Sequence, residues 1–442
     1  MSQPTISVQE SPYWERKWFP WAVFGSLSLI YLLNRSPYVG FHDGLSFLYS
    51  ASRGFDLGTN ATSHFLYHNL LHVLLRMFFF LPDVLVLTVS SICCSLGTLL
   101  LVYRTAGLLT PGRGARLLLV ITLGLSFTFW QQSEIIEVYA FNNLLFSAFL
   151  YISLKDILAQ HRSRYMLASL WLGLGLITHI QHVLSIPFFI AYLWWGNWLR
   201  PWQKVLGMLP WMGCMGILVA MPALTHAHHW TAVFIETKFQ NNLFGWSLPA
   251  LLKGIALGVG MLLYNFHLAL LPAVAGWWEM WAGRRSLFIW LAVLGFPYLA
   301  FAWKYTVNDN HVFYLCFHIV LVLPMVGWAE KITQWKARWM QWMIPVAALA
   351  PITMYAVVTV AARQVPMLEK YDRDKAYKGG LVHLLWPGKA WARDPLELAR
   401  KIHEAKPCGK DSAMPEWNYP VAERYLYGQE PAGALPCIHF QL

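Results

Sequence analysis

The chain has 442 residues, of which 57% are hydrophobic and only 12% are charged, and its formal net charge is +11. Soluble proteins average roughly 45 to 50% apolar and about 25% charged residues, and the mean hydropathy here is positive, at +0.43. These values exclude a disordered chain, a collagen-like fibre, a disulfide-stapled secreted module and a cytosolic nucleotide-binding enzyme. The composition predicts an all-α polytopic membrane protein.

Apolar stretches recur along the chain at lengths near the 17 to 25 residues that a spanning helix needs. We predict eleven spans, at residues 21–34, 84–103, 117–130, 138–154, 165–178, 183–199, 205–224, 255–281, 287–303, 312–328 and 340–361. Residues 63–81 are amphipathic and are expected to lie at the membrane interface without crossing it. The long loop at 225–249 has similar character, and we expect both loops to roof a cavity.

The loop charges predict the orientation of these spans. With the N-terminus in the cytoplasm, fifteen basic residues fall on the inner side and five in the outer loops, which agrees with the positive-inside rule. The inner set is Arg16, Lys17, Arg104, Arg113, Arg116, Lys155, Arg162, Arg164, Arg200, Lys204, Arg284, Arg285, Lys331, Lys336 and Arg338, and the outer set is Arg35, Arg53, Arg76, Lys238 and Lys304. An odd number of spans then places the C-terminus outside. The positive charge is thus explained by topology and anionic lipid, and no nucleic-acid partner is expected.

The two ends of the chain differ in composition from the membrane spans. Residues 1–20 lack the basic start and cleavage site of a signal peptide, so the first span is expected to stay. We predict a membrane domain at 1–361 and an extracytoplasmic segment at 362–442, with a helix near 395–403. Cys408 and Cys437 lie in this outer segment, where a disulfide is predicted and two free thiols are the alternative.

Ionisable residues near membrane depth are candidates for function, and here they gather in the predicted outer loops. Asp43 follows the first span, and its neighbours are aromatic and small, with no cation nearby in the sequence. The remaining candidates lie in three further outer turns and comprise Glu134, Glu137, His179, His182, Lys304, Asp309 and His311. Four separate loops are therefore predicted to present polar groups at one face. For any single residue, the alternative is that outer loops are polar because they face water.

Three histidines in the amphipathic run invite a metal-site interpretation. His64, His68 and His72 recur every four residues, a spacing that lets two imidazoles on one helix face bind one metal ion. No Glu or Cys completes a recognised ligand pattern beside them. We therefore expect no bound metal.

Several short motifs resemble a known membrane family. Residues 130–187 contain Glu137-Val138-Tyr139 at the start of a span and Gly173-Leu174-Gly175-Leu176-Ile177-Thr178-His179 at the end of the next. Together with Asp43-Gly44 and the run from Val307 to Leu315, they resemble the family of unknown function related to protein O-mannosyltransferases, among the GT-C glycosyltransferases. The resemblance covers about residues 41–328.

The resemblance implies a GT-C-like helical bundle that transfers a hexose, mannose above all, from a polyprenyl-phosphate donor to a protein or glycan/lipid acceptor at the outer face. It implies an inverting reaction that needs no cofactor. Asp43 would be the catalytic base. Cations would hold the donor phosphate, and other polar residues would position sugar and acceptor. The phosphate set is Lys304, Arg35 and Arg53, and the positioning set is Glu134, Glu137, His179, His182, Asp309 and Tyr314.

The alternative function is non-catalytic: a transporter or flippase for lipid-linked substrates, or a scaffold. A transporter is expected to have paired broken spans in two related halves, with charged residues near the middle of the bilayer. The charged candidates here gather at one face instead, which favours the enzyme. Membrane lipid, the lipid-linked donor and the acceptor are the expected partners, and the oligomeric state is left open.

Overall fold

The structure is a computed structural model that describes residues 13–40, 43–58, 64–160, 163–195, 199–225, 244–245, 247–305, 307, 310–335, 337–374, 380–388, 394–404 and 418–428. Every regular element in these ranges is helical. The predicted all-α polytopic fold is therefore confirmed, and the apolar composition accounts for it, because a helix satisfies its own backbone hydrogen bonds inside a bilayer.

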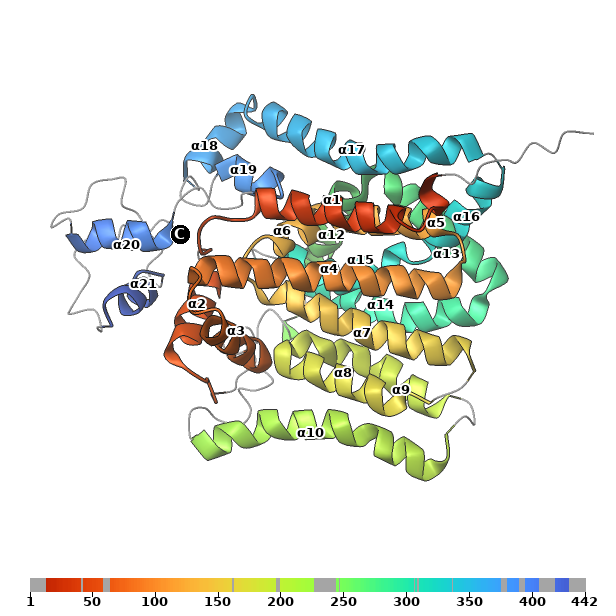
Figure 1. Ribbon diagram of the computed structural model, residues 1–442, viewed down its shortest axis with the longest axis horizontal. Helices are drawn as coiled ribbons and strands as arrows, with labels where there is room; N and C mark the ends of the chain where they lie inside the picture. Colours follow the sequence, from red (N-terminus) through yellow and green to blue (C-terminus); the bar gives the residue numbers. More distant parts are fainter. Residues whose placement is uncertain are drawn as a thin grey trace, which may run out of the picture.

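The long helices run side by side in one bundle (Figure 1), with α17 along one edge and α10 along the other. The bundle helices are α1 (Phe19–Asn34), α4 (Asp83–Leu109), α5 (Arg113–Gly124), α6 (Phe127–Ser133), α7 (Val138–Leu158), α8 (Tyr165–Thr178), α9 (Ile186–Trp194), α10 (Pro201–Thr225), α12 (Leu248–Phe266), α13 (Leu270–Gly283), α14 (Arg285–Lys304), α15 (Leu315–Val322), α16 (Met325–Trp335) and α17 (Ala337–Ala362). Short 3₁₀ turns are η1 (Tyr13–Glu15), η2 (Ile180–Ser185), η5 (His267–Ala269) and η6 (Asn310–Tyr314).

Helices occupy all eleven stretches predicted to span, but they differ in length. Among the described residues, five spans are long and apolar enough to cross a membrane alone, and two bent helix pairs raise the number to seven. Three others are shorter apolar helices, at Phe19–Asn34, Tyr165–Thr178 and Ile180–Trp194. The eleventh, α7, carries Asn142, Asn143 and Lys155, which lower its hydropathy.

Two of the predicted spans are bent. The chain turns by 72° between α5 and α6, and by 42° between η6–α15 and α16. Pro324 lies at the second break, and proline ends a helix because it lacks an N–H and its ring clashes with the preceding turn. At the first break, Ser126 adopts an extended backbone and its hydroxyl donates to the Leu123 carbonyl at 2.8 Å. Residues 117–130 and 312–328, each predicted as one span, therefore each contain a bend between two helices.

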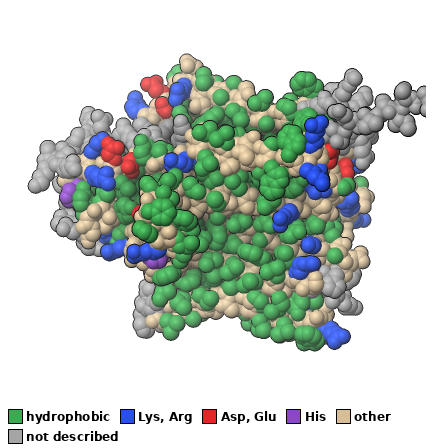
Figure 2. Space-filling view, viewed as in Figure 1, with side chains coloured by type: hydrophobic (Ala, Val, Ile, Leu, Met, Phe, Trp, Pro, Cys, Tyr) green, Lys and Arg blue, Asp and Glu red, His purple; other side chains and the backbone are tan. Residues whose placement is uncertain are grey.

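Hydrophobic side chains cover the middle of the bundle surface, and Lys and Arg lie toward its ends (Figure 2). Exposed residues of this kind include Leu209 on α10, Phe296 on α14 and Val360 on α17. In water such a surface would aggregate, whereas the acyl chains of a bilayer cover it without exposing apolar groups to water. This surface supports a multipass membrane protein.

Short helices collect at one end of the bundle (Figure 1), which we call the α2 end. They are α2 (Asp43–Arg53), α3 (Phe65–Met77), α18 (Pro366–Asp374), α19 (Gly380–Leu385), α20 (Pro395–Glu404) and α21 (Asn418–Tyr427). The helix predicted near 395–403 is confirmed by α20. The Tyr425 hydroxyl donates to Asp83 at 3.0 Å, so α21 is held against the start of α4. Burial and this carboxylate raise the pKa of Tyr425.

Candidate functional site

Two loops that carry acidic residues touch at the α2 end. Asp43 is the first residue of α2, and the following residue, Gly44, packs on the backbone of the turn between α6 and α7. A Cβ atom placed on Gly44 would lie 3.0 Å from the Ile136 carbonyl oxygen. This distance is tighter than a Cβ normally makes, so glycine favours the close approach. The contact brings exposed Asp43 beside the turn that carries Glu134 and Glu137.

The same turn is also tied to the first loop by a backbone hydrogen bond. The Ser36 N–H donates to the Glu134 carbonyl at 3.0 Å. The Glu134 side chain is completely buried, and its carboxylate accepts a hydrogen bond from the Trp130 indole N–H. Glu137 is partly exposed at the N-cap of α7. Arg35 directly precedes Ser36, so one predicted phosphate ligand lies in the loop that meets these acids.

His179 joins three further elements at this end. Its ring lies 5.4 Å from the ring of Tyr139, 6.3 Å from Phe313 and 5.0 Å from His64. Its Nδ1 accepts from the Gln181 N–H at 3.1 Å, which fixes the ring at the start of η2. Burial, together with the neighbouring His64, lowers the pKa of His179 well below its usual value. The imidazole is therefore neutral at pH 7 and can accept or donate a hydrogen bond.

Gln131, which was not among the predicted site residues, connects the site to two distant segments. Its side-chain oxygen lies 3.2 Å from His311 Nε2, and its amide nitrogen donates to the His383 carbonyl in α19 at 3.2 Å. The Tyr264 hydroxyl donates to the Leu385 carbonyl at 2.7 Å, which also holds α19 on the bundle. The signal in the sequence was the Gln131-Gln132 pair at the end of an apolar stretch, where two amides are costly unless they are bonded.

Two of the three predicted phosphate ligands contact groups outside the acidic turn. The Lys304 ammonium donates to the Gly245 carbonyl beyond α14. Arg53 is at the far end of α2, which places its backbone roughly 15 Å from Asp43 at 1.5 Å per residue, and its guanidinium lies over the Tyr49 ring. Arg35 is therefore the predicted cation closest along the chain to the contact between the two loops.

Two of the predicted binding residues lie in the bundle interior. His182 is completely buried and packs against Gly175, whose added Cβ would be 2.6 Å from the imidazole. Tyr314 is also completely buried, and a Cβ added to Gly258 of α12 would lie 2.6 Å from its hydroxyl. Both residues lie beneath the loops, so any role in binding would require a substrate that reaches between the helices. Asp309, Cys408 and Cys437 lie outside the described residues.

The three histidines considered for a metal site point to different neighbours. His64 Nδ1 lies 3.0 Å from the Thr178 carbonyl, and His72 Nδ1 lies 2.7 Å from the Ala51 carbonyl. His68 is 3.6 Å from Asp56. Within the described part of the chain, no group of three His, Cys, Asp or Glu side chains could hold a metal ion.

The assembled site offers carboxylates at the α2 end of an apolar bundle, with a neutral imidazole and side-chain amides nearby. An exposed carboxylate at a helix start can accept a proton from a hydroxyl group, and amides and imidazoles can orient hydroxyl-rich molecules. Arg35 supplies positive charge in the adjoining loop. Such a site suits polar chemistry on a ligand whose remaining part lies in the membrane.

The segment of the chain that matches a known protein family contains the central residues of this site. Residues 70–202 match the family described as "Protein O-mannosyl-transferase TMEM260 N-terminal domain". This stretch contains Gln131, Glu134, Glu137 and His179, whereas Asp43 and Lys304 lie outside it. No curated protein matches the chain. Over residues 70–202 the chain is thus similar to a protein O-mannosyltransferase-like family, which confirms the resemblance indicated by its motifs.

Proposed function

We propose that this protein is a membrane glycosyltransferase that moves a hexose, mannose above all, from a polyprenyl-phosphate donor to a hydroxyl-bearing protein, glycan or lipid acceptor. The observation that carries the proposal is the contact of Asp43-Gly44 with the turn between Glu134 and Glu137. The family similarity supports the transferase class. The candidate face is proposed to be extracytoplasmic, from the loop charges.

The reaction follows from the groups at this face. The acceptor oxygen attacks the anomeric carbon of the sugar as the bond from that carbon to the phosphate oxygen breaks, so the configuration inverts. Asp43 takes the acceptor proton, and the polyprenyl phosphate leaves with the bonding electron pair. A phosphate leaves readily as an anion, so positive charge near it matters more than an acid. Arg35 and Lys304 are proposed for this role.

The remaining polar groups are proposed to orient the two substrates. Glu137 and His179 would bind sugar or acceptor hydroxyls, and Glu134 would hold the turn on which Glu137 lies. The lipid part of the donor would lie along the apolar surface of the bundle. Asp309 is proposed as a further positioning residue from the family resemblance alone.

A transfer assay with polyprenyl-phosphate mannose and the purified full-length protein tests the proposal. General-base catalysis contributes typically about 10² to 10⁴-fold, so Asp43→Asn should lower kcat by that factor while donor binding is retained. Asp83→Asn is the matched control, because it removes a carboxylate at the same end of the bundle without touching the proposed site, and near-normal activity is expected. Lys304→Ala should raise KM more than it lowers kcat.

Two outcomes would contradict parts of the proposal. Normal transfer by Asp43→Asn, with loss of transfer in Glu134→Gln or Glu137→Gln, would place the base on the turn between α6 and α7. If wild-type protein binds the donor but transfers nothing, and none of the three variants differs from it, the transporter or scaffold alternative replaces the enzyme.

A further inference from the structure

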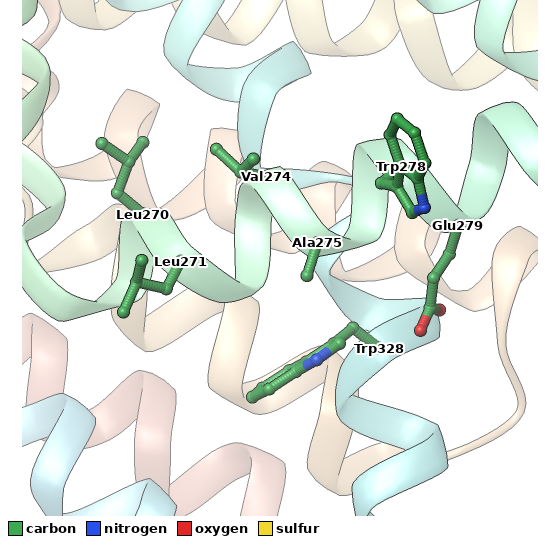
Figure 3. A pocket seen from close by; sticks show the side chains of 7 residues that line it. All are labelled: Leu270, Leu271, Val274, Ala275, Trp278, Glu279 and Trp328. Atoms are coloured by element: carbon green, nitrogen blue, oxygen red, sulfur yellow. The ribbon is translucent and has the colours of Figure 1, made fainter.

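An open apolar groove lies along α13, on a part of the bundle that the proposed reaction does not use. Its volume is about 520 Å³, within the roughly 300 to 1,000 Å³ of ligand pockets. Figure 3 shows Leu271, Val274 and Trp278 projecting from α13, with Trp328 of α16 lying below Ala275. Glu279 lines the groove near its Trp328 side.

Next to the groove, α13 is held very close to the break between α15 and α16. Gly276 faces the backbone of Pro324, where no Cβ could fit. The Trp277 indole N–H donates to the Leu321 carbonyl at 2.9 Å, on the same side of α13. This close contact fixes one side of α13 and leaves Trp278, which is 74% exposed, on the outer side. The groove is therefore a fixed feature of the packing.

The groove lies on a part of the chain that can span a membrane. Its α13 wall belongs to the stretch Leu248–Gly283, which is long and apolar enough to cross a bilayer. Leu271 is 71% exposed, so this wall faces outward from the bundle. In a bilayer the molecules that reach such a wall are lipids, and an apolar groove retains an acyl chain by burying it.

Positive charge surrounds the polar end of the groove. The Lys331 ammonium lies 3.2 Å from the Glu279 carboxylate and remains 62% exposed. The Arg285 guanidinium lies 4.3 Å from the Trp281 ring, on the last turn of α13. Arg284 donates to the Leu109 carbonyl at 3.1 Å, at the end of α4 opposite Asp83. The segments that adjoin this end thus carry three cations, Arg284, Arg285 and Lys331, against two acids, Glu279 and Glu330, and this excess of positive charge favours an anion.

We propose that this groove binds an anionic phospholipid, with one acyl chain along Leu271 and Val274 and the phosphate beside Lys331 and Arg285. The loop charges predict that this end faces the cytoplasm, where anionic lipids are enriched. The site is about one membrane thickness from Asp43, since α4 separates the two ends by 27 residues, or roughly 40 Å. The proposal therefore does not depend on the transferase activity.

Native mass spectrometry of the full-length protein with added phosphatidylglycerol or phosphatidylcholine tests the proposal. The wild type should retain phosphatidylglycerol in preference to phosphatidylcholine. Lys331→Gln should reduce that preference about fivefold, the value of one basic residue near a membrane surface. Glu279→Gln should increase it, because the ammonium loses its internal partner. Misfolding cannot produce this increase, so the pair of variants keeps the test decisive.

Two further variants separate the groove from general surface charge. Ala275→Leu should lower retention of both phospholipids by filling the groove, and Lys155→Gln, at the end of α7, should change neither. Equal binding of the two phospholipids by the wild type would overturn the proposal, as would equal effects of Lys331→Gln and Lys155→Gln. Displacement of phosphatidylglycerol by equimolar undecaprenyl phosphate would overturn it too, because the groove would then belong to the carrier lipid.

Discussion

Two carboxylates, Glu134 and Asp156, are completely buried at opposite ends of the bundle, and their surroundings differ. Asp156 accepts hydrogen bonds from Arg164, at 2.9 Å from its guanidinium and 2.8 Å from its backbone N–H, and from the Tyr192 hydroxyl at 2.8 Å. These contacts close the connection between α7 and α8 and attach it to α9. Glu134 instead accepts from Trp130 and, through its carbonyl, from Ser36, almost a hundred residues earlier.

This difference separates a structural acid from one that organises a site. The Asp156 contacts join neighbouring stretches of chain, so their loss should affect folding. The Glu134 contacts position a turn that meets the start of α2, so their loss should affect transfer. A buried carboxylate at membrane depth is therefore not by itself a mark of function, and the segments that it connects decide which role it has.

The largest effect on stability is expected at the structural acid. Arg164→Ala leaves the Asp156 carboxylate buried without its guanidinium partner, and breaking a buried ion pair costs about 3 to 5 kcal/mol. We expect the lower end of this range, because the Arg164 side chain is 39% exposed. Thermal unfolding in detergent measures the loss, and Lys155→Ala at the same end should change it by less than about 0.5 kcal/mol. Unchanged stability in Arg164→Ala would remove the contrast with Glu134.

Glu134→Gln is expected to show the reverse pattern. The glutamine oxygen can still accept from Trp130, so the free energy of unfolding should change by less than about 1 kcal/mol. Transfer should fall at least tenfold, equivalent to about 1.4 kcal/mol in the barrier, because an amide nitrogen replaces one carboxylate oxygen in the buried turn that positions Glu137. Steady-state kinetics and unfolding of the same preparation measure both quantities. A loss of stability with normal kcat would make Glu134 a second structural acid.

Gly44→Ala tests the contact between the two loops directly. The added methyl group meets the Ile136 carbonyl at 3.0 Å, so the start of α2 must shift by a few tenths of an ångström. The expected cost is about 1 kcal/mol of stability, with a severalfold loss of kcat. Gly25→Ala is the control, because nothing lies within 4 Å of its added Cβ and the change favours the helix. Equal behaviour of the two variants would show that the loop contact is dispensable.

The smallest effect is expected from the pH dependence of His179. Its pKa in the folded protein is lowered, so the unfolded chain binds a proton first as the pH falls below about 6.5. The stability is therefore fully present above that pH and decreases on acidification, until the folded state is protonated as well. Thermal unfolding between pH 5 and 8 should show a shallower slope for His179→Gln than for the wild type. Identical slopes would mean that another group is responsible.

The membrane class, the helical content and the position of each apolar helix could be predicted from the sequence, because hydropathy is a local property of 20 or so residues. The motif around Glu137 and His179 could also be recognised, and the family match covers it. The bend at Ser126 was missed, since both flanking segments are apolar and no proline marks the break. The bend at Pro324 has a signal in the sequence, which is the proline itself.

The sequence by itself determined that polar groups lie in loops on one predicted side of the membrane. Only the tertiary structure decided which of the loop segments meet. Gly44 packs on Ile136, the His179 ring lies beside Phe313, and Gln131 bonds His383 of the C-terminal segment. It also turned Lys304 toward Gly245 and buried His182 and Tyr314 beneath the loops. The contacts of Gly44, His179 and Gln131 join residues from 92 to 252 positions apart in the chain. They depend on how the helices pack against one another, and a residue pattern that repeats every few positions carries no information about such packing.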